Sequence, residues 1–233
     1  ITIVAAFLFM FLVWIYADQF PINIVMLGIF SAIMGWSIGP QIVFLGKKFR
    51  FNQFLKTIGV KKIKSEGKLI FYYEKDSSIS FEVNSDEMLK IKERFNKEVI
   101  EKDHHTYSQK WRNVVFQAMV STTCAIFITL LVVSITDIDF GFLGIFLFIA
   151  LTVLIIVELL NFFIFQSTRF RRFCCYCGVI IFSLYLIYDF NRLEKAAAQG
   201  DESWETAVTI GIKLYLDILN LFLDLLEILS NSQ

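Results

Sequence analysis

The sequence predicts an all-α, multi-pass membrane helix bundle that carries a small soluble α+β insert. Of its 233 residues, 56% are hydrophobic and 19% are charged, with a mean hydropathy of +0.62. Soluble domains are closer to half apolar and a quarter charged. The charged residues are also segregated, so that long uncharged runs alternate with polar stretches. These runs are expected to be helices, because a bilayer offers the backbone no hydrogen-bond partner.

Composition and motifs exclude several classes of protein. The 22 basic and 22 acidic residues cancel, whereas a nucleic-acid-binding protein needs a positive excess to meet the phosphates. Four cysteines are too few for a disulfide-stapled scaffold in a chain of this length. The sequence contains no phosphate-binding loop, no nucleophile with a histidine base and no cofactor fingerprint. We therefore expect no enzymatic activity, no cofactor and no dedicated metal site.

Six membrane spans are predicted, two in residues 1–45 and four in residues 112–233. The hydrocarbon core of a bilayer needs roughly 20 apolar residues per helix. The predicted spans are 1–17, 19–46, 113–136, 140–168, 173–188 and 206–229. The first and fifth are short and must include flanking residues.

Basic clusters indicate the orientation and the membrane. They follow the second and fourth predicted spans, at 47–64 and 169–172, so both lie on the same side. The positive-inside rule places that side in the cytoplasm. Richness in Lys, Ile, Asn and Phe is typical of an AT-rich genome. We favour a prokaryotic plasma membrane, with a eukaryotic endomembrane as the second choice.

Residues 46–111 are predicted to form a soluble module between the second and third spans. Segments 68–74 and 78–83 are rich in β-favouring residues and flank a polar turn, which predicts a hairpin. A helix-start signal at 84–86 is followed by apolar residues at helical spacing. These residues are Met88, Ile91, Phe95 and Val99. We expect a ββα fold, since a hairpin alone is marginal. It is either a plain appendage or a surface for a partner protein.

Ionisable residues interrupt the last predicted span. They recur at spacings of four, three, four and three, which places them on one face of a helix. The stripe consists of Lys213, Asp217, Asn220, Asp224 and Glu227. The stripe could lie at the membrane surface, form a polar seam between helices, or line a hydrated interior. We favour a hydrated interior, because intramembrane ionisable residues usually serve a pathway. Glu158 of the fourth span either joins this lining or extends to the membrane surface.

The last two predicted helices are expected to form an antiparallel hairpin. Gly200 is a typical helix stop and Ser203 a typical N-cap, so the turn is placed near 200–203. Asp189 lies 14 residues before Ser203, and Asp217 lies 14 residues after it. At 1.5 Å per residue, both carboxyl groups should lie at the same depth, about 21 Å from the turn.

Two adjacent carboxyl groups in a poorly hydrated site would act as one proton-sensitive unit. Since they cannot both ionise cheaply, they are expected to share one proton and to titrate as a pair. The protonated pair can hydrogen-bond and hold two helices together. The ionised pair repels itself or attracts a divalent cation. This arrangement is a proton-operated latch in a cation pathway.

Several segments resemble the transmembrane Bax inhibitor motif family. IFSLYLIYDFNRL (181–193) and LYLDILNLFLDLLEIL (214–229) are similar to its last two helices, and these two motifs are specific. GWSIGP (35–40), VFQAMVSTTCAIF (115–127) and DFGFLG (139–144) resemble its middle helices in the same order. The resemblance spans all six predicted helices but not the insert.

This resemblance implies a seven-helix membrane fold and a calcium leak that pH controls through an acidic pair on the last two helices. Matched position by position, the pair is Asp189 and Asp217, and the resemblance implies transient Ca²⁺ binding there. The chain departs from the family pattern in three ways. The first family helix is absent, the insert is unusually long, and a basic residue that some members place on the second helix has no counterpart in 1–17.

Two hypotheses about function follow. The favoured one is a pH-sensitive calcium leak channel, a monomeric pore gated by Asp189 and Asp217, with Asp224, Asn220, Lys213 and Glu158 as ancillary lining residues. The alternative is a membrane regulator that binds partner proteins, such as a protease complex or cell-death factors, through the insert. An intramembrane aspartyl protease is disfavoured, because Asp217 follows Leu-Tyr-Leu and not the required Gly-x-Gly.

Overall fold

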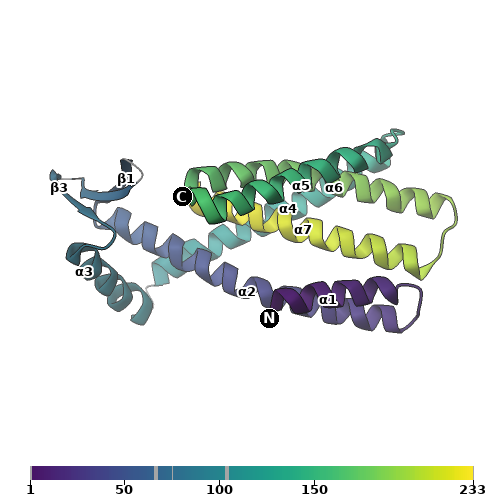
Figure 1. Cartoon of the computed structure of the whole chain (residues 1–233), viewed down its shortest axis with the longest axis horizontal. Helices are drawn as coiled ribbons and strands as arrows, with labels where there is room; N and C mark the ends of the chain where they lie inside the picture. The colour runs from purple at the N-terminus through teal and green to yellow at the C-terminus, as the bar shows by residue number, and fades with distance from the viewer. Residues whose placement is uncertain (1, 66–67, 75, 103–104, 233) are drawn as a thin grey trace. The chain divides into compact units, whose positions relative to one another are not determined.

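Long helices dominate the fold, which is described by a computed structural model (Figure 1). The structure describes residues 2–65, 68–74, 76–102 and 105–232. The chain divides into two compact units. Residues 1–41 and 116–233 form the helical unit, and residues 42–115 form the insert unit. Helices α2 (Ile22–Thr57) and α4 (His105–Ile135) each contribute residues to both.

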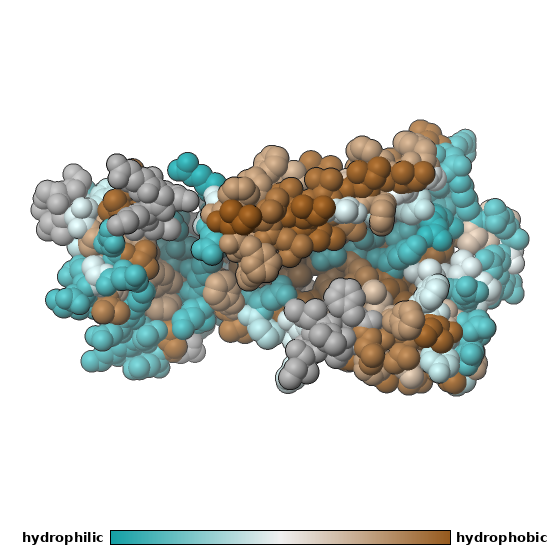
Figure 2. All heavy atoms as spheres, viewed as in Figure 1, coloured by the Kyte–Doolittle hydropathy of each residue, from teal (hydrophilic) through white to brown (hydrophobic). Residues whose placement is uncertain are grey.

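Four helical segments of the described chain are long and apolar enough to cross a membrane. They are α2, α4, Phe140–Phe165 and α6 (Thr168–Ala198). The third consists of a 3-10 turn η2 (Phe140–Phe142), α5 (Leu143–Leu160) and a π-helical end η3 (Asn161–Phe165). Figure 2 shows hydrophobic side chains gathered over α5, where Ile145, Phe146 and Phe148 expose more than half of their surface. Such a surface is suited to lipid contact.

The two other long helices of the helical unit do not meet the conditions for a span. Helix α1 (Thr2–Ile15) has 14 residues, fewer than a bilayer crossing needs. Helix α7 (Trp204–Ser232) is long enough, but its apolar stretch contains four ionisable residues. The four apolar segments correspond to four of the six predicted spans. The first and the last predicted spans, 1–17 and 206–229, stay predictions.

Helix α1 and the first part of α2 pack with the N-terminal half of α7. Their buried core consists of Val13, Ala17, Phe30, Val208 and Ile212. The Tyr215 hydroxyl donates a hydrogen bond to the carbonyl of Ser31 over 3.3 Å. The rings of Phe20 and Trp204 stack with their centroids 5.0 Å apart. These contacts hold α7 from one side.

Helices α6 and α7 make the most extensive helix–helix contact of the chain and run antiparallel (Figure 1). Gly200 has φ +67°, the left-handed conformation that ends a helix without steric cost in glycine. Ser203 Oγ accepts a hydrogen bond from the backbone N–H of Thr206 over 3.3 Å, which caps α7. The predicted hairpin and both of its boundary residues are therefore confirmed.

The break between the α5 segment and α6 differs from the prediction, which ended the fourth span at 168 and began the fifth at 173. Gln166 adopts φ +44°, and α6 begins at Thr168. Ser167 Oγ accepts from the N–H of Phe170 over 3.4 Å, and Asn161 Oδ1 accepts from the N–H of Ser167 over 3.0 Å. Because these caps fix the helix start, the arginines of 169–172 lie in the first turns of α6.

The insert unit contains an antiparallel sheet in the order β1 (Val60–Ser65), β2 (Lys68–Tyr73) and β3 (Asp76–Glu82). Strands β2 and β3 are the predicted hairpin, which is confirmed. Strand β1 was not predicted, so the ββα prediction is wrong by one strand. The sequence VKKIKS lacks strict alternation, and its lysines give it a polar composition. Lysine on an edge strand discourages pairing with another chain.

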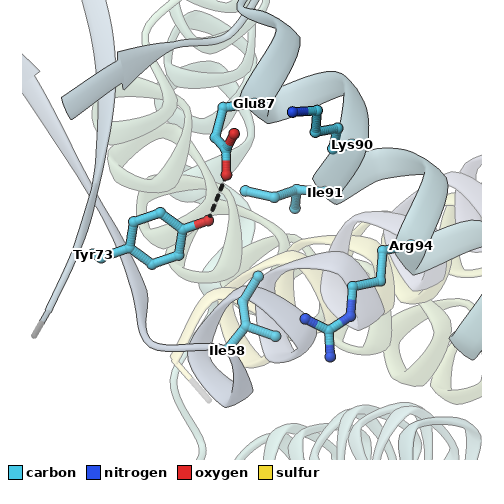
Figure 3. Close-up of a pocket in the computed structure, with 6 residues that line it drawn as sticks. All are labelled: Ile58, Tyr73, Glu87, Lys90, Ile91 and Arg94. Carbon is cyan, nitrogen blue, oxygen red and sulfur yellow. Dashed lines mark hydrogen bonds between the residues drawn. The ribbon is translucent and has the colours of Figure 1, made fainter. Parts of the chain in front are cut away.

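Helix α3 (Asp86–Phe95) and the π-helical η1 (Asn96–Glu101) cover the sheet. Ser85 Oγ caps α3 by accepting from the N–H of Met88 over 3.3 Å. The predicted apolar stripe is confirmed, since Met88, Ile91, Phe95 and Val99 are all buried. They pack against residues of α2 and the sheet, namely Phe54, Leu55, Val60, Phe71 and Phe81. The Tyr73 hydroxyl donates to Glu87 over 3.0 Å, which joins β2 to α3 (Figure 3).

Candidate functional site

Asp189 of α6 and Asp217 of α7 lie next to each other inside the hairpin. Asp189 is 1% exposed and Asp217 is 8% exposed. Their carboxyl groups are within hydrogen-bonding reach of each other. The equal depth predicted from the residue count around Ser203 is therefore confirmed, and both side chains point inward. We call these two residues the aspartate pair.

Apolar residues of the same two helices enclose the pair. Leu186 lies three residues before Asp189, and Leu221 lies four residues after Asp217, so each faces the same side of its helix as the acid. Both leucines are fully buried in a core that also includes Phe182. This packing keeps water from the carboxyl groups, and burial of a carboxylate is unfavourable unless it is paired or hydrogen-bonded.

Three of the four oxygens of the aspartate pair have no hydrogen-bond partner in the described part of the chain. They are both carboxyl oxygens of Asp189 and Oδ2 of Asp217. Two ionised carboxylates cannot satisfy each other, because a carboxylate only accepts hydrogen bonds. One proton on either group would create a donor and allow a hydrogen bond between the two. The geometry therefore accommodates one shared proton.

Two cations lie near the pair. Arg192 Nη1 is 4.0 Å from Asp189 Oδ1, three residues further along α6. Lys213, which the sequence predicted as an ancillary residue, is within electrostatic reach of both acids. Tyr185 is within the same reach. Arg192 and Tyr185 were not predicted from the sequence, although their spacing of three and four residues from Asp189 places them on its helix face.

A second group of ionisable residues lies two helical turns further along α7. Asp224 interacts electrostatically with Glu158 of α5 and with Glu227, and the Cys175 thiol is within hydrogen-bonding reach of Asp224. Arg171 Nη2 lies 3.5 Å from Glu227 Oε2. The structure thus brings together Asp224 and Glu158, which the sequence predicted as ancillary residues, in a group separate from the aspartate pair. Arg171 was missed, because only the fold shows that it lies beside α7.

Asn220 lies between the two groups along α7, and Gly178 of α6 lies beside the second group. Asn220 is half-buried on α7, one turn from Asp217 and one turn from Asp224. The Asp224 carboxylate lies against Gly178 of α6, where an added Cβ would come within 2.0 Å of Oδ2. Glycine is required at this position if Asp224 is to keep its place.

The end of α6 that carries Asp189 is tied to the start of the α5 segment. Asn191 is buried, and its Oδ1 accepts a hydrogen bond from the N–H of Phe140 over 3.2 Å. Lys195 pairs with Asp139. The hydrogen bond from Lys195, together with one from the N–H of Gly141, holds the pKa of Asp139 below its ordinary value. These contacts fix α6 at two residues and at six residues beyond Asp189.

The insert unit has a surface pocket of about 180 Å³ (Figure 3). Its lining consists of Ile58, Tyr73, Glu87, Lys90, Ile91 and Arg94. Glu87 accepts from Tyr73, and Arg94 Nε donates to Glu98 over 2.7 Å, so these groups already serve the fold. Burial and then the hydrogen bond to Glu87 raise the pKa of Tyr73. In the chain as described, no three His, Cys, Asp or Glu residues are grouped as a metal site requires.

Comparison with known proteins places the C-terminal part of the chain in a family. The family model described as "Inhibitor of apoptosis-promoting Bax1" matches residues 105–233, which include the aspartate pair. "Protein LIFEGUARD 1" of Arabidopsis thaliana is 40% identical over 95 residues, 40% of this chain and 37% of that protein. "Golgi anti-apoptotic protein" of Vaccinia virus (strain Lister) is 37% identical over 121 residues, 52% and 48% of the two chains.

An uncharacterized protein of Campylobacter jejuni is 36% identical over 119 residues, 51% of this chain and 48% of that protein. The chain therefore spans about half the length, or less, of the curated relatives it matches. Since the relatives come from organisms with different membranes, they do not distinguish a prokaryotic from a eukaryotic location. The family model covers more than half of the chain, and four apolar helices accompany it. The chain is an integral membrane protein that belongs to the family of inhibitors of apoptosis-promoting Bax1.

Proposed function

We propose that the protein is a pH-sensitive cation leak, with calcium as the permeant ion and the aspartate pair as its switch. One observation carries this proposal. Asp189 and Asp217 face each other in a buried position where three of their four oxygens lack a partner within the described chain. Intramembrane acids that are buried at such a cost usually serve transport or switching.

In the proposed closed state, one proton bridges the two carboxyl groups and holds α6 against α7. Loss of that proton leaves two negative charges. At about 4 Å and an effective dielectric constant of 20, their repulsion is on the order of 4 kcal/mol. A free energy of this size changes an equilibrium constant by about three orders of magnitude. Deprotonation therefore favours separation of the helices.

The separated carboxylates would then offer oxygen ligands to a passing Ca²⁺ ion, which prefers such ligands. Arg192 and Lys213 are the nearby cations that balance the second negative charge in the absence of the ion. Asp224, Glu158 and Asn220 would line the pathway further along α7. Both members of the pair come from one chain, which supports a pore within a monomer. We place it in a prokaryotic plasma membrane first and a eukaryotic endomembrane second.

Calcium flux into proteoliposomes across a pH series tests this proposal. We expect the wild-type leak to increase as pH rises. In Asp189→Asn and Asp217→Asn the neutral amide cannot lose a proton to create repulsion, so the pH dependence should disappear. Asp137→Asn is the matched control, because Asp137 is an exposed aspartate outside the hairpin. If both pair variants leak with wild-type pH dependence, the switch assignment is wrong.

The alternative function is a membrane regulator that acts by binding partner proteins, such as a protease complex or cell-death factors. It is favoured by the name of one relative, "Golgi anti-apoptotic protein", and by the insert unit, which offers a folded surface. Replacing residues 60–101 with a short linker separates the two functions. Loss of the biological effect with intact flux would support the regulator, whereas loss of flux would support the leak.

A further inference from the structure

We infer that Arg192 and Lys213 form a positive layer beside the aspartate pair, and that this layer sets the ion selectivity of the leak by opposing calcium more strongly than potassium. This role rests on the proposed function, because selectivity has meaning only for a conducting protein. It goes beyond the balance of charge on the ionised pair. We call Arg192 and Lys213 the cation layer.

The two cations lie at one depth of the α6/α7 hairpin. Arg192 lies 11 residues before Ser203, and Lys213 lies 10 residues after it. Arg192 is therefore about 4.5 Å nearer the turn than Asp189, and Lys213 is about 6 Å nearer the turn than Asp217. Spacings of three and four residues keep each cation on the helix face of its acid. The cation layer is thus the next charged level on the turn side of the pair.

Two contacts hold the charge of Arg192 at this level. Its Nη1 is 4.0 Å from Asp189 Oδ1, and its guanidinium carbon lies 5.8 Å from the centroid of the Tyr188 ring. A guanidinium is attracted to the negative face of an aromatic ring. The Tyr188 ring in turn rests on α5, where a Cβ on Gly144 would come within 2.9 Å of the Tyr188 hydroxyl oxygen. Contacts with α5 and α6 therefore both set the position of this cation.

Lys213 is exposed, but its charge acts on the same site. It interacts electrostatically with Arg192 and with both acids of the pair. Tyr185 is a further titratable group within reach of the pair. When the pair is ionised, its two negative charges and the two positive charges of the cation layer cancel. Removal of the cation layer would therefore leave this level of the hairpin with two uncompensated negative charges.

The positive charge lies on the turn side of the aspartate pair. The sequence has no Lys or Arg at 173–191 of α6 and none at 214–233, which contains the rest of α7. In that direction the next ionisable residue of α7 is Asp224. A cation between Asp217 and Asp224 has a carboxyl group on either side, whereas a cation on the turn side of the pair meets two positive charges first. The cation layer is therefore a barrier on one side of the acids.

Repulsion by this layer depends on the charge of the permeant ion. The electrostatic energy of an ion in a fixed potential is proportional to its charge, so the cation layer opposes Ca²⁺ twice as strongly as K⁺. Electrostatic barriers of this kind, including those made by arginine, contribute to selectivity in pores. Rates depend exponentially on energy. A change that raises potassium flux by some factor should therefore raise calcium flux by about the square of that factor.

Parallel measurements of potassium and calcium flux into proteoliposomes at alkaline pH test the cation layer. The variant Arg192→Gln/Lys213→Gln removes both positive charges and keeps polar side chains of similar length. We expect potassium flux to rise about threefold and calcium flux about ninefold, so that the ratio of calcium to potassium flux rises about threefold. The single variants Arg192→Gln and Lys213→Gln should each give a smaller rise in this ratio, which also serves if the double variant does not fold.

Two control variants separate charge from structure. Arg192→Lys/Lys213→Arg keeps both charges and should keep the wild-type flux ratio. Lys110→Gln/Arg112→Gln removes one lysine and one arginine from exposed positions of α4. Its net charge equals that of the neutralised variant, and its flux ratio should also stay at the wild-type value.

The possible outcomes distinguish the cation layer from the proposed leak. A wild-type flux ratio in the neutralised variants overturns the cation layer, as does an equal rise in either control variant or a fall in calcium flux. Wild-type pH dependence in Asp189→Asn and Asp217→Asn removes the proposed switch, while the flux ratio still tests the cation layer. A wild type that conducts neither ion overturns the leak and the cation layer together.

Discussion

Charged side chains are exposed in the insert unit and buried in the α6/α7 hairpin. The insert unit carries 16 of the 22 basic and 10 of the 22 acidic residues, and its ion pairs are solvent-accessible, as for Lys61–Glu74 and Arg94–Glu98. In the hairpin, Asp189 and Asp217 are buried against leucines. Surface ion pairs contribute about 0–1 kcal/mol, whereas buried carboxyl groups without donors oppose folding. Stability and the proposed switch therefore reside in different parts of the chain.

The largest expected effect is the loss of a core aromatic residue in the insert unit. Phe95 is buried, with its ring centroid 5.1 Å from that of Phe51 and 5.7 Å from that of Phe54. Phe95→Ala should lower the free energy of unfolding of this unit by about 3–5 kcal/mol. Hydrogen exchange of residues 42–115 measures the change. Ile63→Ala is the control, since Ile63 is 53% exposed; equal effects of the two would contradict an apolar origin of stability.

The next largest effect is an increase in stability, and it concerns the α6/α7 hairpin. The double variant Asp189→Asn/Asp217→Asn removes both buried charges, so at alkaline pH it should be more stable than the wild type by about 1–3 kcal/mol. Near pH 5 the difference should shrink. Denaturant titrations in micelles at the two pH values measure this, with Asp137→Asn as the exposed counterpart. A double variant that is less stable at both pH values would show that the charges support the fold.

A smaller effect is expected for the hydrogen bond between β2 and α3. Tyr73→Phe removes the donor to Glu87 and should lower the stability of the insert unit by about 0.5–1.5 kcal/mol. Protection of the α3 amides from exchange reports this change. Tyr72→Phe is the neighbouring control on the same strand. If Tyr72→Phe lowers the stability as much as Tyr73→Phe does, the hydrogen bond to Glu87 does not account for the loss.

The smallest effect concerns the turn of the hairpin. Hydrogen bonds from Ser203 and Thr206 lower the pKa of Asp201. A carboxyl group with a lowered pKa contributes stability above its unfolded value of about 3.9, and this contribution is lost as pH falls through the folded value. Between about pH 5 and 2, the wild type should therefore lose more stability than Asp201→Asn. Acid titration of the denaturation midpoint tests this, with exposed Glu202→Gln as the control.

Local signals account for what the sequence predicted. Gly200 and Ser203 fix the turn by their own backbone and capping preferences, and the resulting count places Asp189 opposite Asp217. The stripe from Met88 to Val99 follows from helical spacing in the same manner. These features depend on residues close in sequence, so their physical causes are visible without the fold.

Contacts between distant residues could not be predicted in this way. Strand β1 exists because β2 pairs with it and its Val60 joins the insert core, although its lysines make it look like a loop. The pairing of Arg171 with Glu227 joins residues 56 positions apart. The early start of α6 depends on Asn161, which reaches across the break to Ser167. In the first two cases a tertiary contact outweighs the local pattern, and in the third a hydrogen bond across six residues does so.

Gly178 determines where the negative charge of Asp224 lies in the second group of ionisable residues. Because Gly178 has no side chain, the carboxylate of Asp224 can lie directly against the backbone of α6. In Gly178→Ala, the added methyl group would occupy this space and displace the carboxylate. The number of charges would stay the same. Gly178→Ala would thus move the negative charge of Asp224 and keep it, whereas a substitution of Asp224 itself removes the charge.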